Sequence, residues 1–244
     1  MSGEPYPCLL LWLEAPLQSW GYDSRFDRRD SLGFPTKSGV LGLVCCALGA
    51  GGEQRELLAR FANLDLQVVA FVGCDHWSRA RSREPLLCDF QMVGSGYDGA
   101  DPWQNLMIPK TSTGKKAVGG GTKMTYRYYL QDMAFAVALQ VPGELAEDIA
   151  FHLCNPVWAL YLGRKCCVPT EIIYQGNFAD ADTALAAAGK LAGEKKRRPL
   201  FRVYQGEEEG EVMTLNDVPV QFGRRKLYRD RRVTVVPWPE PEDG

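Results

Sequence analysis

Residues 133–141 read MAFAVALQV, and this stretch indicates the fold class more clearly than any other. Apolar side chains occupy every second position and alternate with small or polar neighbours, which is the period of a β-strand. The five apolar positions are Met133, Phe135, Val137, Leu139 and Val141. Pro142 and Gly143 follow directly and end the predicted strand, because proline and glycine both interrupt regular structure.

Strand and helix signals continue on both sides of this stretch. Downstream, Leu145, Ile149 and Leu153 recur at helical spacing and predict an amphipathic helix. Other local patterns predict a strand over 8–13, a helix over 40–48, a shorter helix over 54–64, and strands over 66–73 and 157–162. Thr36 or Ser38 is available as the N-cap of the helix over 40–48. The resulting order is βαββαβ, which predicts an α+β protein with a ferredoxin-like or RRM-like sheet.

The segment 75–124 interrupts this order and differs from it in composition. It is rich in glycine and carries more cations than acids, with few apolar residues at regular spacing. A connection of this length is uncommon inside a compact domain unless it has a function. The sequence therefore predicts a projecting, basic arm inserted into the sheet domain, and we call residues 75–124 the arm.

The predicted organisation has an RRM-like domain over 1–74 and 125–170, the inserted arm over 75–124, and a small β-rich C-terminal region over 171–244. Within the C-terminal region, residues 181–191 are rich in alanine and predict a helix. Basic runs at 224–226 and 229–232 flank Tyr228, and an acidic run extends from Glu207 to Glu211. A solvated loop is the simplest interpretation of the acidic run, whose role the sequence leaves open.

Composition excludes several classes of protein. The 244 residues carry 28 Lys and Arg against 30 Asp and Glu, so the formal net charge is −2, and 45% of the residues are hydrophobic. These values are typical of a globular chain rather than a fibrous or disordered one.

The longest apolar run, 40–50, is shorter than the ~18–20 residues that span a bilayer. The N-terminus lacks the basic region of a secretory signal. We therefore expect a soluble, cytoplasmic protein that does not contact a membrane.

The cysteine pattern argues against a metal site or a disulfide framework. The eight cysteines include adjacent pairs at 45–46 and 166–167 but no Cys-x-x-Cys spacing. Only His76 and His152 are available to complete a ligand set, so a zinc site is not expected. Reduced thiols are the expected state, since free cysteine packs as a small hydrophobic side chain. No metal and no cofactor is predicted.

Motifs for nucleotide binding and catalysis are weak. Residues 94–99 match G-x-G-x-x-G, but Asp101 and Pro102 follow in place of the helix that a dinucleotide site requires. His152 lies within a predicted helix, and His76 begins the arm, where RNA contact is an alternative to a surface role. Neither histidine has the setting of a general base or a nucleophile. No catalytic residue is predicted, and the chain is not expected to be an enzyme.

Three short segments combine cations, aromatic rings and glycine at the ends of predicted strands. They are KMTYRYY at 123–129, QSWG at 18–21 and YLGRK at 161–165. Nucleic acids need cations for their phosphates and flat rings for unstacked bases, and glycine allows a close backbone approach. The segments therefore favour RNA binding. For 123–129, an equally weighted alternative is a solvent-facing strand whose tyrosines pack on the protein.

Four sequence blocks around these segments carry a resemblance to a known family. The blocks are LEAPLQSWG at 13–21, GFPTKSGVLGL at 33–43, TYRYYLQD at 125–132 and YLGRKCC at 161–167. In order and spacing they resemble the CRISPR-associated protein 5 family of the RAMP superfamily, in particular the CasD subunits of type I-E Cascade complexes. The resemblance spans most of residues 9–167, and the C-terminal third matches only loosely.

The resemblance implies an RRM-like domain with a long inserted thumb, which matches the arm. Such subunits hold the 5′ handle of the crRNA and cap one end of the backbone filament of the surveillance complex. The implied partners are the crRNA, the backbone subunit and the large subunit, with target DNA engaged only through the complex. In type I-E systems a different subunit cuts the precursor RNA, so the resemblance implies a non-catalytic scaffold in antiviral defence.

Carried onto this sequence, the resemblance implies a groove for the handle lined by residues from these blocks and from the root of the arm. The residues are Gln18, Trp20, Gly21, Thr36, Lys37, Ser38, Lys123, Tyr126, Arg127, Tyr128, Gly163, Arg164 and Lys165. Thr36, Lys37 and Ser38 would offer a phosphate site at a helix N-terminus. Arg127 and Arg164 rank highest, because arginine binds phosphate bidentately and lysine does not. Weaker candidates on the arm are Lys110, Lys115 and Lys116.

Two alternative functions remain open at the level of sequence. A type I-C relative of the family cuts the precursor RNA, so the first alternative is a metal-independent endoribonuclease. It would use residues such as Tyr126 and Lys123 in general acid–base chemistry, and the low histidine content disfavours it. The second alternative is a ferredoxin-like interaction module that does not bind RNA, in which the basic and aromatic segments would belong to the core.

Overall fold

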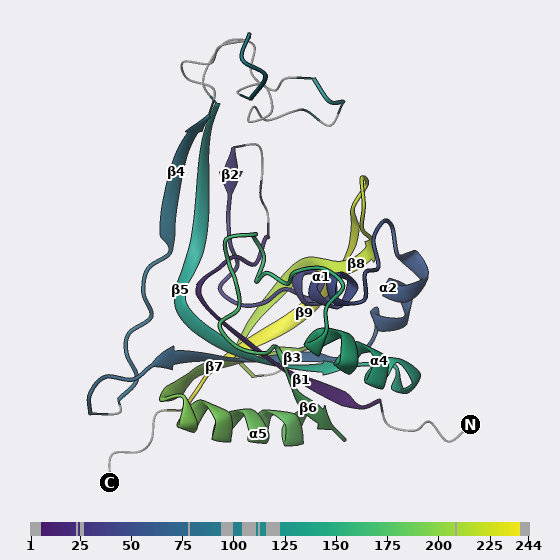
Figure 1. The fold of residues 1–244 in the computed structure, drawn as a ribbon. Helices are drawn as coiled ribbons and strands as arrows, with labels where there is room; N and C mark the ends of the chain where they lie inside the picture. The colour runs from purple at the N-terminus through teal and green to yellow at the C-terminus, as the bar shows by residue number, and fades with distance from the viewer. Residues whose placement is uncertain are drawn as a thin grey trace.

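The structure is built around one sheet of nine strands, and neighbours along its main path are antiparallel (Figure 1). The computed structural model describes residues 6–22, 24, 27–77, 79–93, 100–103, 111, 113–115, 123–207 and 209–239. In spatial order the main path is β6 (Tyr174–Phe178), β1 (Cys8–Gln18), β5 (Lys123–Gln140), β3 (Leu66–Gly73), β7 (Arg197–Gln205), β9 (Leu227–Pro237) and β8 (Glu211–Gln221). Two further strands, β2 (Arg28–Arg29) and β4 (Leu87–Val93), pair with β5 off this path.

Helices cover both faces of the sheet. The helices α1 (Lys37–Ala47), α2 (Arg55–Phe61) and α4 (Gly143–Cys154) lie on one face, and α5 (Ala181–Glu194) covers the opposite face (Figure 1). Within the described part of the chain, no helix has the length and apolar character needed to cross a membrane.

Strand β1 is buried on both sides, which explains its uninterrupted apolar sequence. Its residues Leu9, Leu11 and Leu13 join the core beneath α1, α2 and α4. The alternate residues Leu10 and Trp12 point the other way and join a second core beneath α5. A strand with both faces covered needs apolar side chains at successive positions rather than at every second one.

Local sequence patterns predicted most of these elements correctly. The strand predicted at 133–141 belongs to β5, and the strands predicted at 8–13 and 66–73 belong to β1 and β3. The helices predicted at 40–48 and 54–64 correspond to α1 and α2, with Thr36 as the N-cap of α1. The helical spacings from 145 to 153 and from 181 to 191 correspond to α4 and α5.

The strand predicted over 157–162 is wrong. These residues form an irregular loop in which Trp158 is exposed and Leu162 is buried. The backbone of the loop bonds to the end of β1, where the Ser19 amide donates to the carbonyl oxygen of Leu162 at 3.0 Å. The strand that pairs with β1 at the edge of the sheet is β6, further along the chain. The apolar run therefore misled the prediction, because only Leu162 of these residues is buried and none of them belongs to a strand.

The first half of β5 leaves the sheet together with β4. These strands pair from Leu87 opposite Tyr129 to Val93 opposite Lys123. We call β4 and residues 123–129 of β5 the ribbon, and Figure 1 shows it standing away from the sheet. The second half of β5 pairs instead with β1 and β3. One long strand thus connects a projecting element directly to the centre of the sheet.

The C-terminal strands extend the sheet formed by the rest of the chain. β6 pairs with β1, β7 pairs with β3, and β9 and β8 follow β7 in order. The boundary predicted at residue 170 therefore falls between elements that share one sheet. The division of the chain into an RRM-like domain, an arm and a C-terminal region stays a prediction.

Candidate nucleic-acid interface

A groove of about 630 Å³ opens beside the root of the ribbon. Its walls come from residues 19–21, 24 and 29–30, the outer side of α1, the loop at 158–164 and the turn between β8 and β9. The lining includes Trp20, Gly21, Arg29, Thr36, Ser38, Gly42, Cys46, Trp158, Tyr161, Gly163, Arg164, Phe222, Lys226 and Tyr228. Cations, aromatic rings and small residues are the side-chain types that single-stranded nucleic acids require.

The N-terminus of α1 reaches the groove, and two backbone donors of its first turn are bonded within the protein. Thr36 caps the helix, and its Oγ1 accepts a hydrogen bond from the Gly39 amide at 3.1 Å. The Lys37 amide donates to Asp217 Oδ2 at 2.7 Å. A carboxylate from β8 therefore occupies the position that a phosphate would take at this helix terminus. Thr36 and Ser38 both line the groove, so their contact with phosphate stays a prediction, whereas the Lys37 amide is already bonded within the protein.

The Lys37 side chain points into the protein, away from the groove. It is fully buried, and its Nζ donates to the carbonyl oxygens of Leu64 at 2.5 Å and Ala62 at 3.3 Å. Burial, with a smaller contribution from the Arg231 cation, lowers the pKa of Lys37 to about 8. The structure therefore corrects the predicted contact between Lys37 and phosphate, because the ammonium group bonds to the chain that follows α2.

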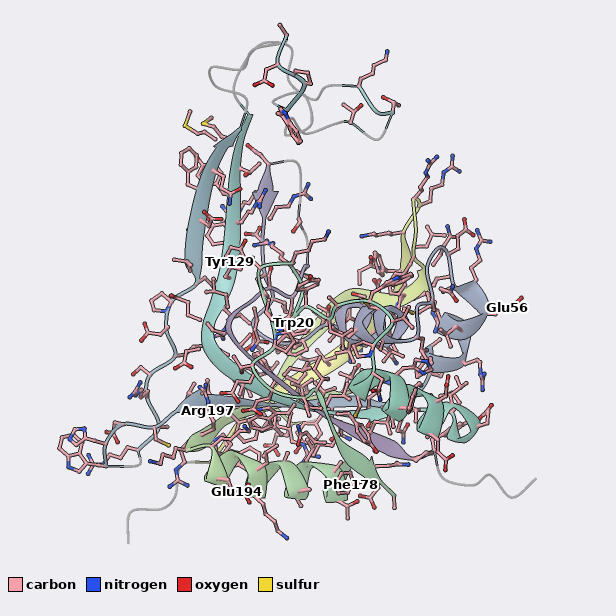
Figure 2. The ribbon with its side chains drawn as sticks, in the orientation of Figure 1. Trp20, Glu56, Tyr129, Phe178, Glu194 and Arg197 are labelled. Atoms are coloured by element: carbon pink, nitrogen blue, oxygen red, sulfur yellow. The ribbon has the colours of Figure 1, made fainter. Side chains whose placement is uncertain are left out.

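Gln18 and Trp20 are buried where β1 ends. Gln18 Nε2 donates to the carbonyl oxygens of Leu13 at 3.2 Å and Met133 at 2.7 Å, and Gln18 Oε1 accepts from Trp20 Nε1 at 3.2 Å. Figure 2 shows Trp20 between β5 and α1. Gln18 therefore holds β1 on β5 and does not line the groove, which corrects its predicted role. Trp20 contributes to the floor of the groove, and Gly21 is exposed at its rim.

The loop that carries Arg164 crosses β1 at a glycine. Gly163 has φ +101, a backbone conformation that favours glycine. A Cβ at this position would lie 1.7 Å from the carbonyl oxygen of Ser19. The two backbones therefore approach more closely than any side chain would allow. This crossing brings Gly163 and Arg164 to the groove. Lys165 follows them and is exposed, but it does not line the groove.

Arg164 connects this loop to the root of the ribbon. Its guanidinium donates to the carbonyl oxygens of Tyr128 at 3.0 Å and Arg29 at 2.8 Å. The same group lies over the ring of Tyr129, with Cζ 4.5 Å from the ring centroid. Figure 2 shows Tyr129 on β5 near the base of the ribbon. Arg164 thus brings a positive charge to the groove and fixes the position of two neighbouring strands.

The ribbon separates the remaining predicted residues onto two faces, because successive side chains of a strand point in opposite directions. Tyr126 and Tyr128 share one face, where Tyr126 packs against Phe90 with ring centroids 5.1 Å apart. The Arg28 guanidinium lies over the Tyr128 ring at 4.8 Å. Arg127 belongs to the other face and is half-buried. The structure therefore does not bring Tyr126, Arg127 and Tyr128 together on one surface.

The predicted lysines of the arm are described only in part. Lys115 is exposed. Lys110 and Lys116 lie outside the described residues, as does the glycine motif at 94–99. Lys123 begins β5, but its side chain lies outside what the structure describes. Contact between these lysines and RNA stays a prediction.

The groove also contains residues that the sequence did not single out for binding. Trp158 is 48% exposed and lies with Tyr161 in the loop that was expected to be a strand. Lys226 and Tyr228 come from the β8–β9 hairpin. Burial raises the pKa of Tyr228, so its hydroxyl stays protonated at neutral pH. The basic run at 224–226 was visible in the sequence, but only the pairing of β8 with β9 carries it to α1.

The chemistry offered by this lining is binding rather than a recognisable catalytic arrangement. Among the described residues, no group of three or more His, Cys, Asp or Glu could hold a metal ion. The described lining of the groove includes no histidine. The absence of catalytic activity stays a prediction, because a lining of this kind does not by itself determine whether bound RNA is cut.

Fold and groove together define an α+β protein with one large antiparallel sheet and a charged, aromatic groove at the base of a projecting ribbon. The chain belongs to the CRISPR-associated protein (Cas_Cas5) family, which matches residues 8–235. The resemblance predicted from four sequence blocks is therefore confirmed, and the match extends through the C-terminal strands.

Individual relatives agree with this assignment. The chain is 29% identical over 229 residues to the CRISPR system Cascade subunit CasD of Escherichia coli (strain K12), which covers 90% of this chain and 94% of the relative. A chain of a solved CRISPR RNA-guided surveillance complex superposes with a TM-score of 0.67 at 29% identity, covering 94% of this chain and 89% of that one. A solved Cas protein superposes with a TM-score of 0.59 at 28% identity, covering 95% of both chains.

Proposed function

We propose that this protein is a non-catalytic RNA-binding subunit of a type I, I-E-like CRISPR surveillance complex, and that it holds the 5′ handle of the crRNA. The observation that carries the proposal is the groove at the base of the ribbon, where Arg29, Arg164 and Lys226 meet Trp158 and Tyr228. The relatives named as a Cascade subunit and a surveillance complex support the same assignment.

The chemistry of the groove suits a short, unstacked RNA strand. Cations neutralise phosphates, and aromatic rings stack on bases that are splayed out of a helix. The chain as a whole is nearly neutral, with a formal net charge of −2, so binding depends on where the cations gather. This favours recognition of one defined segment over indiscriminate binding of long nucleic acid.

The core of the protein is, in this proposal, a ferredoxin-like βαββαβ sheet with an inserted thumb. The strand order β6-β1-β5-β3 supports the assignment, since it is the order 4-1-3-2 when these four strands are numbered along the chain, with β6 in the place of the strand wrongly predicted at 157–162. The ribbon corresponds to the base of the thumb. Its outer face exposes Phe90, Met92, Met124 and Tyr126, an apolar surface suited to a protein neighbour.

The proposed partners follow from this placement. The ribbon would contact the neighbouring backbone subunit, and this chain would cap the end of the backbone filament beside the large subunit. Target DNA would be engaged only through the assembled complex. The proposed location is the cytoplasm, where the complex meets invading nucleic acid.

One experiment separates the proposal from its enzymatic alternative. Purified full-length protein is incubated in EDTA with the end-labelled repeat RNA of its own locus, and each sample is run on a native and a denaturing gel. The proposal expects RNA that is retarded on the native gel and intact on the denaturing gel. Discrete cleavage just upstream of the handle would contradict it and favour a metal-independent endoribonuclease. The same incubation with the backbone subunit added tests whether binding requires this neighbour.

A further inference from the structure

The turn between β8 and β9, residues 222–226, has a defined position beside α1. The Phe222 amide donates to the carbonyl oxygen of Glu53 at 2.9 Å. Gly223 has φ +77, and a Cβ there would lie 3.4 Å from the carbonyl group of Gly52. Figure 1 shows the tip of this hairpin rising beside α1 and α2, with which β8 is in contact. The turn is therefore a fixed wall of the groove.

This turn presents three consecutive cations. Lys226 lines the groove, whereas Arg224 and Arg225 are exposed beside it on the same turn. None of the three forms an ion pair with a residue that the structure describes. Arg231 of the same hairpin is different, because it pairs with Asp217 at 2.7 Å. Neighbouring like charges repel one another, and a bound polyanion would remove this repulsion.

Helix α1 presents to the groove a glycine that no contact with the described residues explains. A Cβ built at Gly42 meets no atom of these residues within 4 Å. At Gly39, one turn earlier, a Cβ would lie 2.8 Å from Trp20 Cε3, so the packing of the protein itself requires that glycine. Glycine destabilises a helix interior relative to alanine. The groove is therefore open above Gly42 at a position where a side chain would make the helix more stable.

An exposed aromatic ring contributes to the same part of the groove. Trp158 is 48% exposed, and its Cη2 lies 3.1 Å from the position of a Cβ on Gly51. In the segment that follows α1, Gly51 thus lies against Trp158. The next residue, Gly52, lies against the β8–β9 turn. A flat ring of this kind can stack on a nucleobase of any sequence.

We propose that the groove includes a second RNA subsite between α1 and the β8–β9 turn. A sugar–phosphate segment lies directly on α1 at Gly42, and its phosphates contact Arg224, Arg225 and Lys226. This subsite rests on the proposed function and extends it to nucleotides beyond those held at the base of the ribbon. Its ligand is the backbone of single-stranded RNA, with one base able to stack on Trp158.

The charge of the turn is tested with a pair of variants that change the net charge equally. Arg224→Glu alters the proposed subsite, and Lys190→Glu alters an exposed position on α5, on the opposite face of the sheet. Full-length proteins are titrated with a short RNA that carries the handle of their own locus. We expect Arg224→Glu to weaken binding about tenfold or more, and Lys190→Glu to change it less than about twofold.

The space above Gly42 is tested with a second matched pair. Gly42→Ala and Gly189→Ala both replace a helical glycine whose Cβ position has no atom of the described chain within 4 Å. Both should raise the melting temperature, because alanine favours the helix. Only Gly42→Ala should weaken binding of the same RNA, by about fivefold or more, since the added methyl group occupies the subsite. A purely structural role for Gly42 would not produce higher stability together with weaker binding.

The outcomes distinguish this subsite from the proposed function. If the wild-type protein binds the RNA and both Arg224→Glu and Gly42→Ala bind like wild type, the subsite is disproved and the proposed function stands. If the wild-type protein does not bind the RNA, alone or with the backbone subunit, both proposals fail. Weakening by Lys190→Glu equal to that by Arg224→Glu would also overturn the subsite, because net charge alone would then explain the effect.

Discussion

The two faces of the sheet each carry a helix with small side chains, and the reasons are opposite. On α5, Ala184, Ala188 and Ala192 are buried in one core with the rings of Trp12 and Phe71, whose centroids lie 5.3 Å apart. On α1, most of the side chains that face the groove are small as well, but the groove beside them stays open. The alanines of α5 make room for large side chains of the protein itself, whereas α1 leaves room that the described chain does not fill.

This difference shows how a small residue in a sequence can be interpreted. Gly39 and Gly42 lie in the same helix, yet Trp20 explains the first and no side chain in the described part of the protein explains the second. A small residue beside a filled space is a packing requirement. One beside an open, charged groove points to a ligand instead, and variants on the two faces should therefore affect different properties.

The largest expected effect concerns a groove residue that packing alone requires. Gly163→Ala places a Cβ 1.7 Å from the carbonyl oxygen of Ser19 at a φ of +101, so the two backbones must separate. We expect the free energy of unfolding to fall by at least ~3 kcal/mol, measured by urea denaturation. A loss below ~1 kcal/mol would mean that the backbone crossing is not rigid, and that the groove is less fixed than the structure indicates.

A somewhat smaller effect is expected on the α5 face. Ala188→Leu adds a large side chain to a fully buried position in the core shared with Trp12 and Phe71. We expect a loss of ~1–3 kcal/mol in the free energy of unfolding from overpacking, with RNA affinity of the folded protein unchanged. Unchanged stability, or reduced RNA affinity at full stability, would contradict the assignment of this face to packing.

Arg164 joins the groove to the ribbon, so its removal should reduce RNA binding. Arg164→Ala eliminates a cation of the groove and two hydrogen bonds, to the carbonyl oxygens of Tyr128 and Arg29. We expect RNA binding to weaken by ~1–3 kcal/mol in a fluorescence titration, and Arg127→Ala to have the smaller effect of the two. Arg202→Ala is the matched control, because Arg202 is likewise partly buried and pairs with Asp182 at the start of α5. Equal affinities for all of these proteins would exclude the groove as the RNA site.

The smallest effect is a pH dependence that arises from Lys37. Its pKa is lowered from 10.5 to about 8 in the folded protein, so between these values the unfolded chain binds more protons. The contribution of Lys37 to stability therefore increases as the pH rises from about 8 to 10.5. Three buried thiols oppose this trend, because burial raises the pKa of Cys8, Cys45 and Cys167 from 9.0 to about 11.

The contribution of Lys37 is isolated by comparison with Lys37→Met, which keeps all three thiols. Unfolding free energies of both proteins are measured at pH 8 and pH 10. The difference should shift in favour of the wild-type protein at the higher pH, because deprotonated Lys37 no longer carries a buried charge. A difference that is independent of pH would mean that the ammonium group retains an ordinary pKa.

The elements that could be predicted from sequence are those that local periodicity determines. The second half of β5, α1 and α4 each show their own period of two or of 3.6 residues, and β3 is a short, continuous apolar run. The loop at 157–162 misled this approach, because its apolar side chains are distributed between the core at Leu162 and the groove at Trp158. Apolar side chains that belong to two different surroundings, the core and an open groove, can thus follow one another without forming a strand.

The site was predicted less well than the fold, and the reason is long-range pairing. Lys37 was assigned to phosphate from its place beside a helix N-terminus, but Asp217, 180 residues away in the chain, takes that position. Gln18 was assigned from its neighbours Trp20 and Gly21, yet it bonds across to β5. The basic turn at 224–226 reaches the groove only because β8 packs beside α1. None of these pairings has a local signal in the sequence.

The most direct test of the RNA-binding groove is a crosslinking map of the handle. The full-length chain, with its backbone subunit and a crRNA that carries 4-thiouridine in the 5′ handle, is irradiated and digested, and the crosslinked peptides are identified by mass spectrometry. The account predicts crosslinks to residues 19–30, 158–165 and 222–228 and to the exposed side of α1. Crosslinks concentrated on α5, with none on these segments, would contradict it.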